Sequence, residues 1–194
     1  MFRPASGRDL TESVSELIAE LPPDQFTVSL SFYNIPVTTP SHFRNKILLH
    51  EGSMIQMTNE QYYTVIQPYT DAMNLILTRL DILNHQAGDR DEPHPIHSIT
   101  SRIKEKDSIE KKLRKKHSDG SVRDARALLK DIAGIRVICF FEHDIRLLAG
   151  CLKKQTDLIV ISEKDYIKNP KPNGYRSYHL ILGVPIYHLD GMEY

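Results

Sequence analysis

The chain of 194 residues has few cysteines, no net charge and no long apolar run, and each absence excludes a class of protein. Its two cysteines, Cys139 and Cys151, sit among apolar residues and form no Cys-x-x-Cys pair, which argues against a disulfide or zinc framework and for a reducing compartment. No apolar stretch approaches the ~20 residues that span a bilayer, and "MFRPASGRDL" lacks the apolar core of a signal peptide. The sequence therefore predicts a cytoplasmic protein with no membrane partner.

Although the 25 Lys and Arg residues balance the 25 Asp and Glu residues, the basic residues are concentrated in two segments. Residues 102–117 hold eight Lys or Arg against three acidic residues, and residues 164–176 hold four against one. Two local basic patches in a neutral chain favour phosphate groups bound at a site over a surface that coats nucleic acid. Gly-x-Ser-x-Gly and P-loop patterns are absent, so neither that class of hydrolase nor a Walker-type NTPase is supported.

The order of expected elements is typical of an α/β (α+β) fold, with a mixed β-sheet flanked by helices. We expect helices at 10–21, over 58–83, from about 107 and over 145–152, and strands at 26–32, 134–141, 157–161 and 178–187. Thr58 and Gln61 form a capping box at the start of the long helix, in which Pro68 is expected to produce a kink. Asp107 is expected to cap the next helix, with Glu110 at its capping-box position. The polar segment 85–98 fits no zinc spacing and is interpreted as a linker.

The run "GIRVICFF" at 134–141 predicts a strand covered on both sides, which opens a βαβ unit ending at 157–161. Arg136 lies inside this run, and burial of a guanidinium without a partner is costly. Asp131 comes just before the strand, where sheet folds place ligand-binding side chains. Two interpretations stay open: a structural Arg136–Asp131 ion pair, or an arginine that binds an anion or stacks on a flat ring.

The segment "KNPKPNGYRSYH", residues 168–179, is expected to be a loop between two strands. Its two prolines restrict the backbone and its Asn-Gly pair predicts a turn, which would present Lys171, Tyr175 and Arg176 in a fixed arrangement. A rigid tyrosine beside lysines suits a nucleotide, because the ring stacks on a base and the ammonium groups contact phosphates. The alternative is a solvated basic loop with a packing tyrosine.

In this order, "SRIKEKDSIEKKL", "DIAGIRV" and "EKDYIKNPKPNGYRSYH" resemble the synthetase domain of the RelA/SpoT homologues, most closely the stand-alone small alarmone synthetases. The resemblance runs from about residue 60 to the end and implies a nucleotidyltransferase-like fold. Residues 1–57 would be an N-terminal extension of unassigned role, and residues 58–194 the (p)ppGpp synthetase domain. Such enzymes use Mg²⁺ and move the β,γ-pyrophosphate of ATP onto the 3′-hydroxyl of GDP or GTP, which makes (p)ppGpp, the alarmone of the stringent response.

The resemblance also implies a role for each matched residue. The residues that would bind ATP are Arg102, Lys104, Ser108, Lys112 and Arg136. The residues that would line the GDP or GTP side are Lys164, Lys171, Asn173, Tyr175 and His179. Within these sets Arg102 and Arg136 would enclose the adenine, and Tyr175 would stack on the guanine. Asp131 would be the catalytic residue and the Mg²⁺ ligand.

The chain departs from the family pattern near residue 190. The pattern should continue into a strand reading Glu-x-Gln-x-Arg-Thr, whose Glu assists the metal or the acceptor, whereas this chain stops at "LDGMEY". Asp190-Gly191 predicts a hairpin with a short return strand, and Glu193 does not match the family Glu by position. We therefore expect a synthetase domain that lacks its C-terminal strand and helix, as a fragment or a natural truncation.

Three functions stay open at this stage. The first is an alarmone synthetase, which by resemblance would form a homo-oligomer, often a tetramer. The second is a toxin-type relative that pyrophosphorylates the 3′ end of tRNA, for which the basic segment 111–117, "KKLRKKH", would contact the acceptor stem. The third is a fragment that binds nucleotides but is catalytically incomplete.

Overall fold

The computed structural model describes residues 26–32, 56–88, 94–118, 120–189 and 191–194. The elements in these ranges are β1 (Phe26–Phe32), α2 (Asn59–Ala87), β2 (Ile96–Ile103), α3 (Lys106–Lys115), α4 (Val122–Leu128), β3 (Ala133–Cys139), α5 (Glu142–Lys153), β4 (Ile159–Asp165), β5 (Tyr178–Gly183), β6 (Ile186–His188) and β7 (Gly191–Glu193). The helix expected at 10–21 lies outside the described residues.

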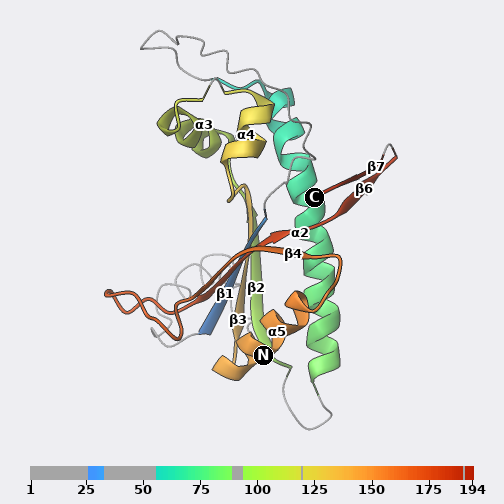
Figure 1. Cartoon of the computed structure of the whole chain (residues 1–194), viewed down its shortest axis with the longest axis vertical. Coiled ribbons are helices and arrows are strands. Elements are labelled where there is room, and N and C mark those ends of the chain that lie inside the picture. The colour runs from blue at the N-terminus through green and yellow to red at the C-terminus, as the bar shows by residue number, and fades with distance from the viewer. Residues whose placement is uncertain (1–25, 33–55, 89–93, 119, 190) are drawn as a thin grey trace, which may run out of the picture.

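Five strands form one mixed sheet in the order β2-β3-β1-β5-β4 (Figure 1). The central strand β1 is antiparallel to β3 and parallel to β5, and the edge strands β2 and β4 are antiparallel to their neighbours. The mixed sheet flanked by helices is confirmed, as is the strand at 26–32. The strand β1, which comes from the segment 1–57, is paired on both sides within the sheet.

The expected βαβ unit is present in a modified form. The strands β3 and β4 run parallel and are connected through α5, but β1 and β5 lie between them. The prediction that β3 is covered on both sides is wrong, because its side chains alternate: Ile135 and Val137 are buried, whereas Arg136 is exposed. The apolar run concealed this alternation because Ile138 shares the open face with Arg136.

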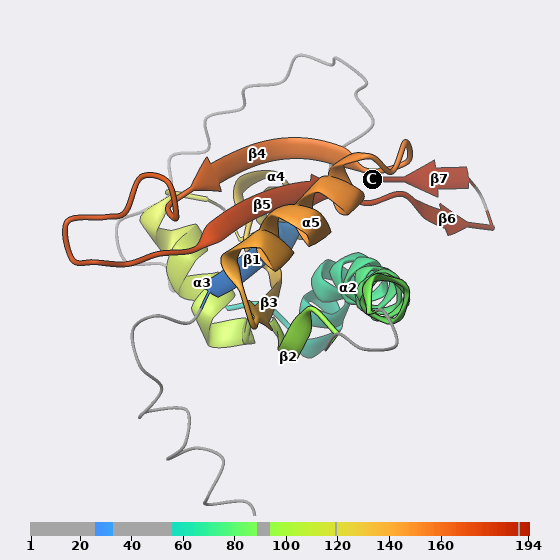
Figure 2. The ribbon, with the colours of Figure 1, turned by 90° about the horizontal axis from the view of Figure 1, so that it is seen from below.

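Helices α2 and α5 lie on the same side of the sheet (Figure 2), and the hydrophobic core lies between these helices and the strands. Ile76 of α2 and Leu148 of α5 are fully buried there against strand residues such as Leu30 and Leu180. Burying each such side chain contributes roughly 1.5–3 kcal/mol to stability. The opposite face of the sheet is consequently free to carry polar side chains.

Helix α2 begins as the capping box predicts. The Thr58 hydroxyl accepts the N–H of Gln61 at 3.1 Å, and the Gln61 side chain accepts the N–H of Thr58 at 2.8 Å. The helix continues through Pro68 and ends only at Ala87, so the linker is shorter than expected.

The capping expectation for α3 is wrong. This helix begins at Lys106, follows Glu105 and has no side-chain cap, so Asp107 lies within its first turn. Glu110 is not part of a capping box, because its carboxylate accepts the N–H of Met57 at 2.8 Å. A backbone donor from a distant segment has taken the place of the local capping interaction.

Two strand predictions differ from the structure, one at the edge strand β2 and one at the run that contains β5. Residues 96–103 form the edge strand β2, which was not predicted and which begins inside the segment 85–98 that was interpreted as a linker. The apolar run at 178–187 is divided by Pro185, which cannot donate to a sheet, into β5 and β6. The predicted hairpin is confirmed, because β6 pairs with β7 as a separate two-stranded sheet (Figure 1).

Both cysteines carry free thiols, as expected, with Cys139 buried and Cys151 half-buried. Burial, followed by the charge of Asp144, raises the pKa of the Cys139 thiol to about 12, which makes it unreactive. Within the described part of the chain, no helix has the length and apolar character needed to cross a membrane.

Candidate functional site

One transverse row of residues crosses the open face of the sheet from edge to edge. The strand register pairs Thr100 with Arg136, Arg136 with Ser29, Ser29 with His179, and His179 with Lys164. Residues directly opposite each other on neighbouring strands point to the same face. The fold thus places Arg136, His179 and Lys164, which come from three strands, on one surface.

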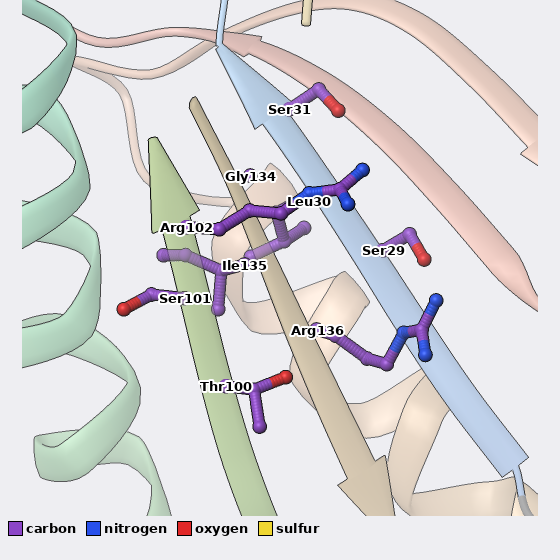
Figure 3. Close-up of a pocket in the computed structure, with 9 residues that line it drawn as sticks. All are labelled: Ser29, Leu30, Ser31, Thr100, Ser101, Arg102, Gly134, Ile135 and Arg136. Carbon is purple, nitrogen blue, oxygen red and sulfur yellow. The ribbon is translucent and has the colours of Figure 1, made fainter. Parts of the chain in front are cut away.

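A cavity of about 320 Å³ lies on this face over β1, β2 and β3 (Figure 3). In the row next to that of Arg136, Arg102 pairs with Gly134 and Gly134 pairs with Ser31. Gly134 has no side chain to fill the space. Figure 3 shows the side chains of Arg102 and Arg136 extending in the same direction towards β1, near Ser31 and Ser29.

The spacing of the two arginines suits a flat ring. Neighbouring rows on one face of a sheet are two residues apart, which is about 6.7 Å along the strand. Stacked planar groups need about 3.5 Å between them, so one ring fits between two guanidinium groups. Arg102 and Arg136 are both exposed on this face, so the argument from the cost of a buried Arg136 does not apply.

Asp131 forms a charged centre where β2 ends and β3 begins. Lys104 donates to its Oδ2 atom from 2.9 Å, and Lys112 of α3 donates to the same oxygen. Burial alone raises the pKa of Asp131, but the hydrogen bonds from Lys112 and Lys104 and their charges outweigh burial, so the pKa lies below its ordinary value. Asp131 is therefore ionised and is paired with two lysines instead of with Arg136.

Two further contacts shape this charged centre. The N–H of Lys104 donates to the carbonyl of Ile132 at 2.7 Å, which joins the strand ends beside Asp131. Ser108 lies in the first turn of α3, four residues before Lys112 and therefore on the same side of the helix. Tyr62 of α2 donates its hydroxyl to the carbonyl of Lys104 at 3.2 Å, which attaches the centre to the core helix.

The segment between β4 and β5, residues 166–177, is named the β4–β5 loop and extends away from the body of the protein (Figure 2). Two backbone hydrogen bonds stabilise its tip. The N–H of Gly174 donates to the carbonyl of Lys171 at 2.9 Å, and the N–H of Lys171 donates to the carbonyl of Tyr175 at 3.2 Å. Gly174 has a φ of 78°, a conformation that favours glycine. The Asn173 side chain accepts the N–H of Tyr175 at 3.2 Å, so the predicted Asn-Gly turn is confirmed.

An aromatic cluster forms where this loop returns to the sheet. The Tyr175 hydroxyl and His179 Nε2 are hydrogen-bonded at 2.9 Å. Tyr166 meets both rings edge-on, with centroid distances of 6.0 Å to Tyr175 and 5.3 Å to His179. The Lys171 ammonium lies 4.7 Å from the Tyr166 ring centre and 5.0 Å from that of Tyr175. Tyr166 was missed in the sequence, where only its place beside the basic loop could have indicated a role.

Proteins of known family match this architecture. A family model described as a region found in RelA / SpoT proteins matches residues 101–192. The chain is 35% identical over 135 residues to GTP pyrophosphokinase YwaC of Bacillus subtilis (strain 168), covering 70% of this chain and 64% of that protein. The crystal structure of small alarmone synthetase 1 from Bacillus subtilis, bound to its product pppGpp, matches with a TM-score of 0.60 and 30% identity, over 69% of this chain and 68% of that one. The chain belongs to the RelA/SpoT family.

A second curated relative, GTP pyrophosphokinase YjbM of Bacillus subtilis (strain 168), is 30% identical over 138 residues. This RelA/SpoT family chain spans about 64% of the length of each of these two curated relatives. The family region starts at Ser101, so β1, which supplies Ser29 and Ser31 to the cavity, lies outside it. The structure therefore adds to the site a strand that the family motifs do not contain.

The environment of His179 leads to a prediction on its titration. Burial, and then the charges of Lys171, Lys164 and Arg136, lower the pKa of His179 below its ordinary value of 6.5. Above that pH the imidazole is neutral in both folded and unfolded chains. At lower pH the unfolded chain takes up the proton first, so the free energy of unfolding decreases as the pH falls below about 6.5.

We expect Lys171→Ala to raise the pKa of His179 towards its ordinary value, because it removes the charge that contributes most to the lowered pKa and opens the cluster to water. NMR titration of the histidine ring protons measures this pKa directly. Lys168→Ala is the control, since it removes a lysine of the same loop whose charge does not act on His179. An unchanged or lower pKa in Lys171→Ala contradicts the prediction.

Proposed function

We propose that this protein transfers the β,γ-pyrophosphate of ATP to the 3′-hydroxyl of GDP or GTP. The observation that carries the proposal is the row Arg136–His179–Lys164, which joins the arginine cavity to the aromatic cluster of the β4–β5 loop on one face. The names of the two curated relatives and the pppGpp bound to a solved relative support a guanine nucleotide as the acceptor.

On the donor side, Arg102 and Arg136 would enclose the adenine ring in the cavity. Lys104 and Lys112, with Ser108 beside them, would contact the phosphates. In the structure both lysines form ion pairs with the carboxylate of Asp131, so their ammonium groups already lie together around one negative charge. A triphosphate carries more negative charge than one carboxylate and would compete for the same ammonium groups.

The donor set fits a magnesium ion. Mg²⁺ in phosphate-transfer sites is generally held by one or two carboxylates together with phosphate oxygens and water. Asp131 supplies one ionised carboxylate, and the described residues contain no group of three or more His, Cys, Asp or Glu that would suggest an all-protein site. When bound, the ion would neutralise charge on the phosphates during transfer.

On the acceptor side, Tyr175 would stack on guanine. The hydrogen bond to neutral His179 and the edge contact with Tyr166 hold the Tyr175 ring before a ligand arrives, which reduces the entropic cost of binding. Lys164 and Lys171 would contact the acceptor phosphates. The Asn173 side chain stabilises the turn by accepting the N–H of Tyr175. Pyrophosphate transfer needs positioning and charge neutralisation more than covalent help, and this surface supplies both.

The direct test is to incubate the purified chain with Mg²⁺ and ATP labelled at the γ-phosphate, and to offer GDP, GTP and bulk tRNA in parallel. We expect label on a guanine nucleotide and none on tRNA. Label on tRNA would replace the proposal with the tRNA-modifying alternative, in which neutralising Lys115 and Lys116 should weaken RNA binding. If the chain binds nucleotides but transfers label to none of the acceptors, the proposal of transfer is wrong and the function is nucleotide binding alone.

A further inference from the structure

Asp165, the last residue of β4, holds the base of the β4–β5 loop through backbone groups. Its Oδ1 atom accepts the N–H of Ile167 at 3.0 Å and the N–H of Lys168 at 2.8 Å. Its backbone carbonyl accepts the N–H of Asn169 at 3.2 Å. One residue thus organises the turn with which the loop leaves the sheet.

The second carboxylate oxygen attaches this turn to the body of the protein. Arg146 of α5 donates to Asp165 Oδ2 at 3.2 Å and also donates to Glu142 at 2.9 Å. Burial raises the pKa of Asp165, but the N–H groups of Lys168 and Ile167 and the Arg146 guanidinium outweigh burial, and the pKa lies below its ordinary value. The carboxylate is therefore ionised, and charged acceptors make the stronger hydrogen bonds.

The turn determines where Tyr166 lies. Tyr166 is the first residue after Asp165, and its N–H donates to the carbonyl of Ser177 on the returning side of the loop at 2.9 Å. Its ring then contacts Tyr175 and His179 edge-on. A change in the turn at Asp165 would displace the ring that supports Tyr175.

We propose that Asp165 is a positioning residue for the guanine acceptor: it holds the turn that places Tyr166 against Tyr175 and His179, and it does not touch the nucleotide itself. This inference rests on the proposed function, in which Tyr175 stacks on the acceptor base. The backbone hydrogen bonds to Oδ1 carry the effect. The Arg146 ion pair is partly exposed and contributes little by itself.

Two substitutions separate these contributions. Asp165→Ala removes the acceptor of both N–H groups, so we expect GDP binding to weaken by about 10-fold while binding of an untransferable ATP analogue stays within about two-fold. Asp165→Asn keeps an Oδ1 acceptor and loses only the charge, so it should restore most of the GDP affinity. Calorimetric titration with each nucleotide measures both affinities without requiring turnover.

Glu163→Ala is the matched control. Glu163 lies two residues earlier on β4 and is bonded to Lys153 of α5 at 3.0 Å, so its removal also breaks a β4–α5 ion pair but leaves the turn intact. It should lower the unfolding temperature without a selective loss of GDP binding. Equal GDP affinity in wild type and Asp165→Ala overturns the inference, as does an equal loss for GDP and the ATP analogue.

Hydrogen exchange distinguishes failure of this inference from failure of the proposed function. In Asp165→Ala, the amides of Ile167, Lys168 and Tyr166 should exchange faster than in wild type, whether or not a nucleotide binds. If the wild-type protein binds no GDP, the proposed acceptor site is wrong. Faster amide exchange in Asp165→Ala would then still show that Asp165 stabilises the turn of the loop. Unchanged exchange at these amides overturns that role of Asp165.

Discussion

Asp131→Ala is expected to abolish pyrophosphate transfer, with a loss of at least about 100-fold in kcat, while the fold is retained. Asp131 is the carboxylate that faces Lys104 and Lys112 at the donor end of the site, and it is partly exposed, so no buried core packing is lost. The γ-labelled ATP assay measures transfer, and thermal unfolding followed by circular dichroism verifies the fold. Turnover at the wild-type rate would remove Asp131 from the metal-binding role.

The same substitution has an opposite expected effect on binding of nucleotide without metal. Asp131→Ala releases Lys104 and Lys112 from their shared ion pair, so their ammonium groups become available to phosphates. We expect ATP in the absence of Mg²⁺ to bind at least as tightly as to wild type, and the gain from added Mg²⁺ to disappear. Asp107→Ala, which removes an exposed carboxylate from the first turn of α3, is the control and should change neither property.

Tyr175→Ala is expected to raise the KM for the guanine acceptor by about 5- to 150-fold, because base–aromatic stacking contributes about 1–3 kcal/mol. The KM for ATP should change little, since the donor cavity is lined by β1, β2 and β3 and not by the β4–β5 loop. Steady-state kinetics with each substrate varied in turn gives the two values. Equal effects on both KM values would contradict the assignment of Tyr175 to the guanine.

Two other substitutions show whether the ring or its hydroxyl matters. Tyr175→Phe keeps the stacking surface and loses the hydrogen bond to His179, so its acceptor KM should lie much closer to wild type than that of Tyr175→Ala. Tyr187→Ala removes an exposed tyrosine of β6, which belongs to the separate two-stranded sheet, and should leave both KM values unchanged. A Tyr175→Phe variant as impaired as Tyr175→Ala would shift the role from the ring to the hydroxyl.

The local elements could be predicted because the residues that determine them are neighbours in the chain. Thr58 and Gln61 are three residues apart, and the capping box they form is present. The turn at Asn173-Gly174 and the hairpin of β6 and β7 likewise depend on a few adjacent residues. The expectation for Glu110 failed because its carboxylate accepts the N–H of Met57, a residue far away in the chain. The expectation for Asp107 failed because helix α3 begins at Lys106, one residue earlier.

The site was predicted as a list of residues, but its arrangement was not. Arg136 was expected to be buried, whereas the alternation of β3 places it on the open face. Its proposed partner Asp131 is paired instead with Lys104 and Lys112. Neither result can be obtained from spacing along the chain, because each depends on which elements lie on the two sides of β3.

By itself, the sequence determined the start of α2, the Asn-Gly turn, the hairpin near residue 190, the two basic segments and the motifs that identify the RelA/SpoT family. All of these depend on residues close together in the chain. Only the tertiary structure decided that β1 is the central strand, that Arg136, His179 and Lys164 form one row, and that the Tyr166 ring contacts Tyr175 edge-on. The physical reason is that strand pairing joins segments far apart in the chain. Many pairings satisfy the same local pattern, and burial of the whole core selects one of them.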